Sequence, residues 1–468
     1  MDLELLEFDI ESLNGKKNFH LKFKDSILIL VGENGSQKTT ICKLLHGLMT
    51  KNWPVLFLYD FSSIRLSFCC DGKRDEIELD QEKFLKEVAN MNIDRRWYEA
   101  FFSKGISRRE RERSLRYVFD SLGLCGGKRA RAVSERHGIP LRNRRVSGMT
   151  AQSDEIISSI NRLWEIDEKL EEVFSHRVLY LPTYRRIEDD LDSLIEPNEE
   201  LTRVEAKRIG RFRYAYSEMI QFGMEDVEDA LEKREGKLRW FSQQAQQELT
   251  LRYLSKILAR EYKNPAVSSS CYEASMIDDV LSRIDSGILG SREKKQIADS
   301  ISKVQSGESA EELDLILFHY FFQLKEFCDT LKNEESCFID FSRICNSYLY
   351  ENRINYDSHT LSCDIEGPVA KRDGDGGGID RGAALSRLSS GEKQIVSIFS
   401  KLNLEYDKSM FVIIDEPELS LSIEWQRKLL PDMLSSSGCC GLMATTHSPF
   451  IFENGLVEYV HGVNEFEV

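Results

Sequence analysis

The chain has 468 residues, 41% of them hydrophobic and 30% charged, which is typical of a globular protein with two or three domains' worth of core. A net charge of −16 argues against uniform, histone-like binding of nucleic acid, and no run of roughly 18 apolar residues predicts a membrane span. The eleven cysteines are scattered without C-x-x-C spacing, and the N-terminus is acidic. We therefore expect a cytoplasmic protein with reduced thiols and no zinc site.

The chain begins with a predicted β-hairpin over residues 5–24. An apolar-rich, partly alternating run, Leu5–Ile10, is followed by the turn signal Asn14-Gly15 and by alternation over Phe19–Phe23. Further strands are predicted at 56–59, 64–69 and 76–79, with a turn at Asp71-Gly72. Residues 1–80 are thus expected to form an antiparallel β layer around a phosphate-binding loop.

That loop is predicted at residues 31–40, Val-Gly-Glu-Asn-Gly-Ser-Gln-Lys-Thr-Thr. An apolar strand pattern (26–31) precedes it and a helical pattern (41–48) follows, which is the context of a phosphate loop. Backbone N–H groups and the dipole at a helix N-terminus favour a bound triphosphate. The predicted nucleotide-binding residues here are Asn34, Gly35, Ser36, Gln37, Lys38, Thr39 and Thr40.

Lys38 is expected to reach the β and γ phosphates of ATP, and the Thr39 hydroxyl to ligate Mg²⁺. One position departs from the usual pattern, because Gln37 stands where glycine is common. Glycine permits close backbone approach to phosphate, so we expect Gln37 to slow turnover. Taken alone, these ten residues also fit an ordinary strand–turn–helix crossover with a surface lysine.

Residues 81–175 have a mainly helical pattern that contains a basic stretch. Between Lys104 and Arg145, thirteen Lys or Arg residues oppose four Asp or Glu residues. The stretch fits a surface that docks phosphates or an acidic partner, and it equally fits a solvated helix face with a loop.

A strand predicted at 177–183 is expected to return to the sheet that carries the phosphate-binding loop. The pattern of residues 200–262 suggests long helices and an antiparallel helical arm, without the sustained heptads of a long coiled coil. Residues 275–335 add further amphipathic helices. The glycine-rich segment 372–382 is predicted to be a loop. No sensor glutamine can be assigned.

Two carboxylates and a histidine follow buried strands near the C-terminus. Ser389-Ser390-Gly391 begins a predicted helix whose N-terminus could bind phosphate oxygens. The apolar run 410–414 ends in Asp415-Glu416, and the run 441–446 ends in His447. Carboxylates at such a place are costly unless they bind a cation or activate water. Asp415 is therefore predicted to hold Mg²⁺ together with Thr39, while Glu416 and His447 are predicted to be catalytic.

Together these motifs resemble those of the ATP-binding-cassette ATPase heads of the SMC and OLD-like class. Gly32–Thr40 resembles Walker A, 388–394 the signature motif, 413–417 Walker B, 419–422 the D-loop, and Thr446–Ser448 the switch. The resemblance covers roughly residues 1–80 and 380–468. It implies an α/β P-loop NTPase head and an ATP-sandwich homodimer, in which Ser390 and Gly391 of one copy contact the γ-phosphate held by Lys38 of the other.

Three sequence segments, at 388–397, 415–422 and 446–454, are similar to those of the AriA ATPase family of PARIS anti-phage systems. The PtuA family of Septu systems is a second similar family. This resemblance implies an ATP-dependent sensor and scaffold that forms higher homo-oligomers, such as hexamers. It also implies a separate effector nuclease, either TOPRIM-type (AriB-like) or HNH-type, and a phage trigger that mimics DNA and docks on residues 104–145. No nuclease motif is recognisable in this chain.

The expected organisation has an N-terminal ATPase lobe (1–80), a large helical insertion (81–360) and a C-terminal ATPase lobe (361–468). The alternative function is a DNA-repair or DNA-tethering SMC-like ATPase that grips duplex directly. A transporter ATPase is disfavoured, because the insertion is far larger than such heads carry.

Overall fold

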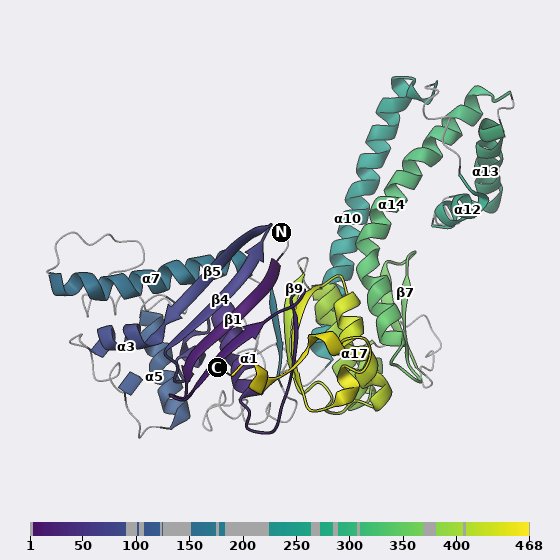
Figure 1. Cartoon of the computed structure of the whole chain (residues 1–468). Helices are drawn as coiled ribbons and strands as arrows, with labels where there is room; N and C mark the ends of the chain where they lie inside the picture. Colours follow the sequence, from purple (N-terminus) through teal and green to yellow (C-terminus); the bar gives the residue numbers. More distant parts are fainter. Residues whose placement is uncertain are drawn as a thin grey trace. The chain divides into compact units, whose positions relative to one another are not determined.

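The computed structural model describes residues 3–89, 101–102, 107–121, 124, 151–174, 177–182, 224–263, 272–283, 289–306, 309–367, 381–405 and 409–467. The chain divides into two compact units (Figure 1). The first comprises Met1–Phe222 and Tyr406–Val468, and the second comprises Gly223–Glu405. These compact units begin and end at other residues than the predicted lobes and insertion, whose bounds at 80 and 360 stay a prediction.

The first unit contains an antiparallel sheet of four strands in the order β2-β1-β4-β5, namely Lys17–Lys22, Leu3–Leu13, Ser63–Cys70 and Lys73–Asp80. Both predicted turns are confirmed. Asn14 and Gly15 have φ of 54° and 70°, and Asp71 and Gly72 have φ of 49° and 76°. Tight hairpins require such left-handed conformations, which Asn, Asp and Gly adopt most readily.

A second sheet of five strands has the order β11-β3-β10-β9-β6, and all its pairings are parallel. Its strands are Val460–Gly462, Ile27–Val31, Cys439–Thr446, Met410–Asp415 and Val178–Leu181. The expected return of 177–183 to this sheet is confirmed, since β6 pairs with β9. The register places Val31 beside Thr446 and Asp415 beside Thr445, so three strands end at one edge of the sheet. Loops at this edge commonly bind ligands in α/β folds.

The strand predicted at 56–59 is wrong. Helix α2 covers Trp53–Leu56, and residues 57–59 form turns. Pro54 in the first helical turn has the fixed φ that a helix start accepts. Trp53, Leu56 and Phe57 are buried in the core, so the apolar run reflects burial and not strand periodicity.

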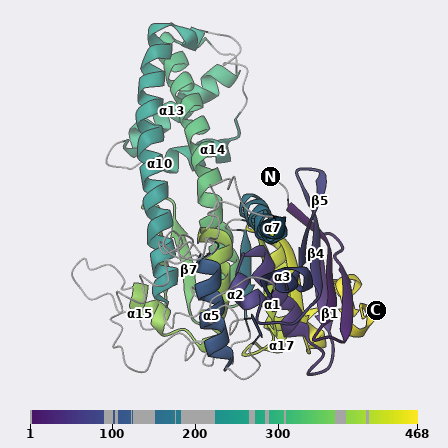
Figure 2. The same cartoon turned by 90° about the vertical axis from the view of Figure 1, so that its left-hand side faces the viewer.

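The remaining helices of this unit are α1 (Lys38–Met49), α3 (Gln81–Ala89), α5 (Arg108–Ser121), α7 (Ala151–Phe174) and α17 (Ile423–Ser435). Helices α3 and α7 lie on one face of β4 and β5 (Figure 2). The Phe57 ring contacts Phe84 of α3 and Phe119 of α5, with centroids 5.2 and 5.0 Å apart. Trp53 Nε1 donates to buried Asp167 of α7 at 3.0 Å, which fixes α7 to the core.

The second unit is built on two long helices, α10 (Glu225–Leu258) and α14 (Glu312–Asn346), which pack along each other (Figure 1). Lys256 bonds Gln323, and Arg234 pairs with Glu334, so the two helices run antiparallel. Its other elements are α12 (Ala274–Ser282), α13 (Ser291–Ser306), β7 (Arg353–Asp357), β8 (Ser362–Glu366), α15 (Arg381–Ser386) and α16 (Ser390–Ser400). Short helical segments lie at Glu261–Lys263 and Lys401–Glu405 in this unit. Those at Pro449–Ile451, Val457–Tyr459 and Val463–Glu465 belong to the first unit. None of the described helices combines the length and the apolar character that a membrane crossing requires.

Glu235 of α10 is a buried carboxylate that joins three elements. Its Oε1 accepts from Arg381 of α15 at 2.9 Å and from the Cys363 backbone N–H of β8 at 2.8 Å. Its Oε2 accepts from Arg239, one turn along α10, at 3.1 Å. Because Glu235 is only 3% exposed, these donors offset the cost of removing its charge from water. The long helix is thereby fixed to the segment that leads into α16.

Replacing Arg283 with alanine is expected to destabilise the second unit by about 3 kcal/mol. Arg283 Nη1 donates to both oxygens of Glu335, at 3.1 and 3.0 Å, and Glu335 is fully buried. The variant would leave that carboxylate without its guanidinium. Arg343→Ala is the matched control, because its ion pair with Asp340 is exposed and worth less than about 1 kcal/mol. Chemical denaturation measures both variants, and equal losses would contradict the expectation.

Candidate functional site

The loop between β3 and α1 folds around its own lysine. Lys38 Nζ donates to the Gly32 carbonyl at 2.7 Å, to the Glu33 carbonyl at 3.1 Å and to Ser36 Oγ at 3.4 Å. Lys38 is 6% exposed, and burial lowers the pKa of its ammonium, while the nearby carboxylates of Asp415 and Glu416 oppose that shift. The sequence thus places a buried cation at the start of α1, with Asn34 and Gly35 exposed beside it.

Gln37 occupies the N-cap of α1 with φ 70°, a left-handed conformation that glycine adopts without strain. This gives a second physical reason why glycine is usual there, beyond the close approach to phosphate. The Gln37 Oε1 atom is buried and accepts no hydrogen bond among the described residues. The position is therefore doubly unfavourable for a glutamine.

Gln37→Gly is expected to raise the free energy of unfolding by about 1 kcal/mol, because it relieves the left-handed strain and removes the unpaired oxygen. It should also raise the rate of ATP hydrolysis, if Gln37 slows turnover as the sequence suggests. Lys43→Gly is the control within α1, where glycine should instead destabilise by about 1 kcal/mol. Urea denaturation and steady-state turnover test both statements, and a Gln37→Gly protein with unchanged turnover would contradict the second.

Thr39 and Asp415 meet at the carboxyl edge of the parallel sheet. Thr39 Oγ1 donates to Asp415 Oδ1 at 3.2 Å, and Thr445 Oγ1 bonds the same carboxylate oxygen. Asp415 is 2% exposed, so its charge needs such partners or a cation. A hydroxyl and a carboxylate oxygen this close suit Mg²⁺, which takes few protein ligands and completes its shell with water and phosphate. The described residues hold no cluster of three or more His, Cys, Asp or Glu for a metal cage.

Glu416 follows the last residue of β9 and also has a left-handed backbone, with φ 51°. Its backbone N–H donates to the Thr445 carbonyl at 2.9 Å, which fixes the end of β9 to β10. No hydrogen bond reaches its carboxylate from the described residues. Strain at a residue that the surrounding structure holds in place is common at functional sites.

His447 is exposed just beyond β10, and its backbone is held by a hydrogen bond to Glu418. Its N–H donates to Glu418 Oε1 at 2.7 Å, and Thr446 Oγ1 donates to Glu418 Oε2 at 2.8 Å. Gln426 of α17 bonds Ser448 Oγ at 2.7 Å. Sequence reasoning assigned no role to Thr445, Glu418 or Gln426. Only the adjacency of β9 and β10, two separately predicted strands, could have indicated them.

Ser389 is the N-cap of α16, and Ser390 is its first residue. Ser389 Oγ accepts from the Glu392 N–H at 3.4 Å, and the Glu392 carboxylate accepts from the Ser389 N–H at 2.8 Å, which forms the predicted capping box. Ser390 is exposed, whereas Gly391 is buried. These residues belong to the second compact unit, and the loop at 31–40 with Thr39, Thr40, Asp415, Glu416 and His447 belongs to the first.

The basic stretch is described only in part. Lys104 and residues 125–145 lie outside the described residues, and α5 carries the remainder. Leu115, Val118 and Phe119 bury one face of α5, while Arg108 and Arg109 are exposed. Arg108 Nη2 donates to the Tyr59 hydroxyl at 3.1 Å. The described part is thus an amphipathic helix with an arginine-rich outer face.

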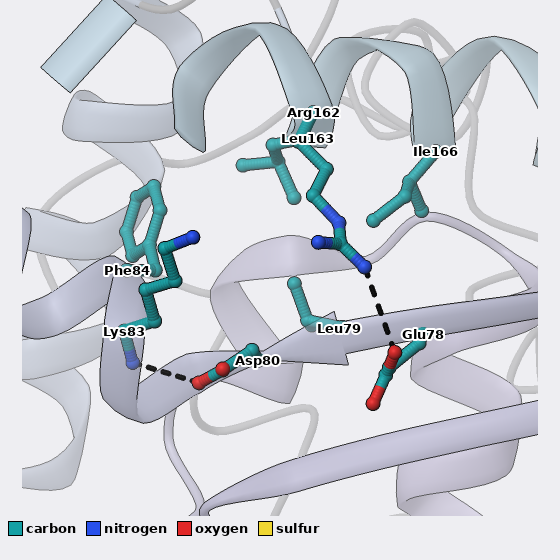
Figure 3. Close-up of a pocket in the computed structure, with 8 residues that line it drawn as sticks. All are labelled: Glu78, Leu79, Asp80, Lys83, Phe84, Arg162, Leu163 and Ile166. Atoms are coloured by element: carbon teal, nitrogen blue, oxygen red, sulfur yellow. Dashed lines mark hydrogen bonds and ion pairs between the residues drawn. The ribbon is translucent and has the colours of Figure 1, made fainter. Parts of the chain in front are cut away.

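A small hollow lies elsewhere in the first unit, between β5, α3 and α7 (Figure 3). Arg162 and Glu78 approach to 3.6 Å across it, and Leu79, Phe84 and Leu163 are among the residues that line it. It contains none of the predicted site residues.

The described cysteines form no disulfide, and burial raises the pKa of several thiols, Cys42 among them.

No family model matches this chain, and no curated protein does. Among solved structures, the chain is similar to the Smc head domain with an extended coiled coil, bound to the C-terminal domain of ScpA, from Pyrococcus furiosus. The two are 12% identical over 97% of this chain and 92% of that one, with a TM-score of 0.36. It is also similar to the Smc head domain with a coiled coil and joint from Pyrococcus yayanosii, at 12% identity over 97% and 93% and a TM-score of 0.34. Similarity at this level decides nothing about function.

Proposed function

We propose that this chain is an ABC-type ATPase that binds ATP with Mg²⁺ and hydrolyses it to ADP and phosphate. One observation carries the proposal. Three segments far apart in the sequence bring Lys38, the Thr39–Asp415 pair, Glu416 and His447 to one edge of a parallel sheet. A buried lysine, an oxygen pair suited to a cation and a free carboxylate match groups that phosphoryl transfer uses, and an exposed imidazole lies beside them.

In this proposal Lys38 exchanges its contacts with the loop carbonyls for contacts with the β and γ phosphates. Backbone N–H groups of residues 34–40 bind the same phosphates. Thr39 and Asp415 would hold Mg²⁺, which when bound would neutralise charge on the phosphate oxygens. Glu416 orients the attacking water and accepts its proton, and His447 donates a hydrogen bond to the γ-phosphate.

Ser390 and Gly391 complete the site from a second copy of the chain. Ser390 is exposed at the N-terminus of an 11-residue helix, where N–H groups and the helix dipole favour an anion. ATP would therefore join two copies, and its hydrolysis would separate them. This arrangement provides a switch with two assembly states.

We further propose that the switch serves bacterial anti-phage defence. The support is the similarity of the phrases at 388–397, 415–422 and 446–454 to AriA-type and PtuA-type ATPases. In this role the ATP-bound homo-oligomer holds a separate effector nuclease and releases it when a phage protein docks. The arginine-rich face of α5 offers positive charge to an acidic, DNA-mimicking trigger.

The alternative is an SMC-like ATPase that grips duplex DNA directly, and the same arginines favour it. The purified chain should hydrolyse ATP only with Mg²⁺, and no hydrolysis would contradict the ATPase proposal. Titration with a 30-base-pair duplex and with an acidic DNA-mimic protein, each at low and high salt, separates the two roles. Binding of the acidic protein alone supports the sensor, whereas salt-dependent binding of duplex supports the DNA-gripping ATPase. Copurification of a neighbouring nuclease from its native cells supports the effector partner.

A further inference from the structure

We propose that Glu418 is the positioning residue for His447, and that it couples this histidine to the segment 419–422. The inference rests on the proposed ATPase function, which assigns His447 to the γ-phosphate. Glu418 lies three residues beyond Asp415 and touches none of the predicted nucleotide-binding groups through a described hydrogen bond. It acts through the loop that carries the histidine.

Both carboxylate oxygens of Glu418 are used by that loop. Oε1 accepts from the His447 backbone N–H at 2.7 Å, and Oε2 accepts from Thr446 Oγ1 at 2.8 Å. Thr446 is fully buried, and its Oγ1 accepts in turn from the Ser448 N–H at 2.9 Å. Three consecutive residues are therefore held, directly or through Thr446, by one carboxylate. Hydrogen bonds to an ionised acceptor are shorter and stronger than neutral ones, which suits a rigid support.

Gln426 of α17 ties the same two segments together a second time. Its Nε2 donates to the carbonyls of Glu418 and Leu421, at 3.3 and 3.0 Å, and its Oε1 accepts from Ser448 Oγ at 2.7 Å. One face of the network thus belongs to residues 418–421 and the other to residues 446–448. A displacement of either segment is transmitted to the other through these bonds.

Glu416 and Glu418 therefore have different roles. Both oxygens of the Glu418 carboxylate accept hydrogen bonds from the loop that carries His447, which commits Glu418 to holding that loop. No described residue bonds the Glu416 carboxylate, which leaves it available to the attacking water. Ser420 is exposed within 419–422 and has φ 67°.

The test combines Glu418→Gln with His447→Ala. Glutamine keeps the size of the side chain but can accept at only one of the two positions. We expect Glu418→Gln to lower kcat for ATP about 10- to 100-fold, because small misplacement of a catalytic group is costly, and to leave the Kd for ATP within about twofold. In the Glu418→Gln background, His447→Ala should cost little more, whereas in the wild type it should cost as much as Glu418→Gln. If the double variant instead lost kcat by the product of the two single losses, Glu418 would have a general structural role and the proposal would be overturned.

Glu424→Gln is the matched control, because Glu424 is exposed in the first turn of α17. If wild type hydrolyses ATP and Glu418→Gln behaves like this control, the proposal is wrong. If wild type neither binds nor hydrolyses ATP, the ATPase proposal itself fails. Should Glu418→Gln not fold, the pair Thr446→Val and Thr446→Ser carries the test. Valine removes the hydroxyl at constant size and should reproduce the loss of kcat, and serine should restore turnover. Equal turnover of these two variants would also overturn the proposal.

Discussion

Glu416→Gln is expected to lower the rate of ATP hydrolysis about 10²- to 10⁴-fold while the protein still binds ATP. Glutamine has the size of glutamate and can still form hydrogen bonds, but its neutral amide cannot accept the proton of the attacking water. The backbone at Glu416 is held by its N–H bond to the Thr445 carbonyl, so the substituted side chain should occupy the same place. The ATP-bound assembly should accumulate, which size-exclusion chromatography with ATP and Mg²⁺ would detect.

Two comparisons make the Glu416 experiment decisive. Glu424→Gln changes charge equally on an exposed site and should leave turnover unchanged. Glu416→Asp, which keeps the carboxylate but draws it back by one methylene, should retain more activity than the glutamine variant. Normal turnover by Glu416→Gln would show that another group is the base.

Lys38→Ala is expected to weaken ATP binding at least about 100-fold and thereby to abolish hydrolysis and ATP-dependent assembly. Each hydrogen bond from a charged donor contributes roughly 1.5–3 kcal/mol, and the ammonium would make several to the triphosphate. The present contacts of Lys38 to the Gly32 and Glu33 carbonyls show that its Nζ lies inside the loop and not on the surface. Lys38 is therefore not a surface lysine, since its side chain is buried within the loop.

Isothermal titration with ATP and Mg²⁺ measures the Lys38 effect. Lys43→Ala is the matched control on the same helix, because Lys43 lies in α1 beyond the loop and should leave binding within about twofold. A fluorescent ATP analogue provides an independent readout. Unchanged affinity in Lys38→Ala would remove the loop at 31–40 from the nucleotide site.

Much of the parallel sheet could be predicted, because its strands are short apolar runs and their tips carry chemically distinctive residues. Val31, Asp415 and Thr446 end three such runs, and parallel pairing brings their ends together. The hairpins at Asn14 and Asp71 were equally predictable, since tight turns require residues that tolerate positive φ.

The rest depended on tertiary contacts that leave no local signal. Residues 53–59 have strand-like apolar content, yet Pro54 and burial on several sides favour a helical turn. Glu418 and Gln426 resemble surface residues until β9 and β10 place their loops side by side. The left-handed backbone of Gln37 was hidden because glutamine gives no hint of it.

The attachment at Glu235 fixes one part of α10, and the rest of the helix packs along α14. From Glu235 to Leu258 the helix rises about 35 Å, at about 1.5 Å per residue. A rotation of about 5° at the Glu235–Arg381 attachment would therefore sweep its far end through about 3 Å, close to the diameter of a water molecule. Lys256, near that far end, bonds Gln323 of α14, so the two long helices would move as a pair. Arg381 stands nine residues before Ser390, so the attachment about which they would turn is close in sequence to the start of α16.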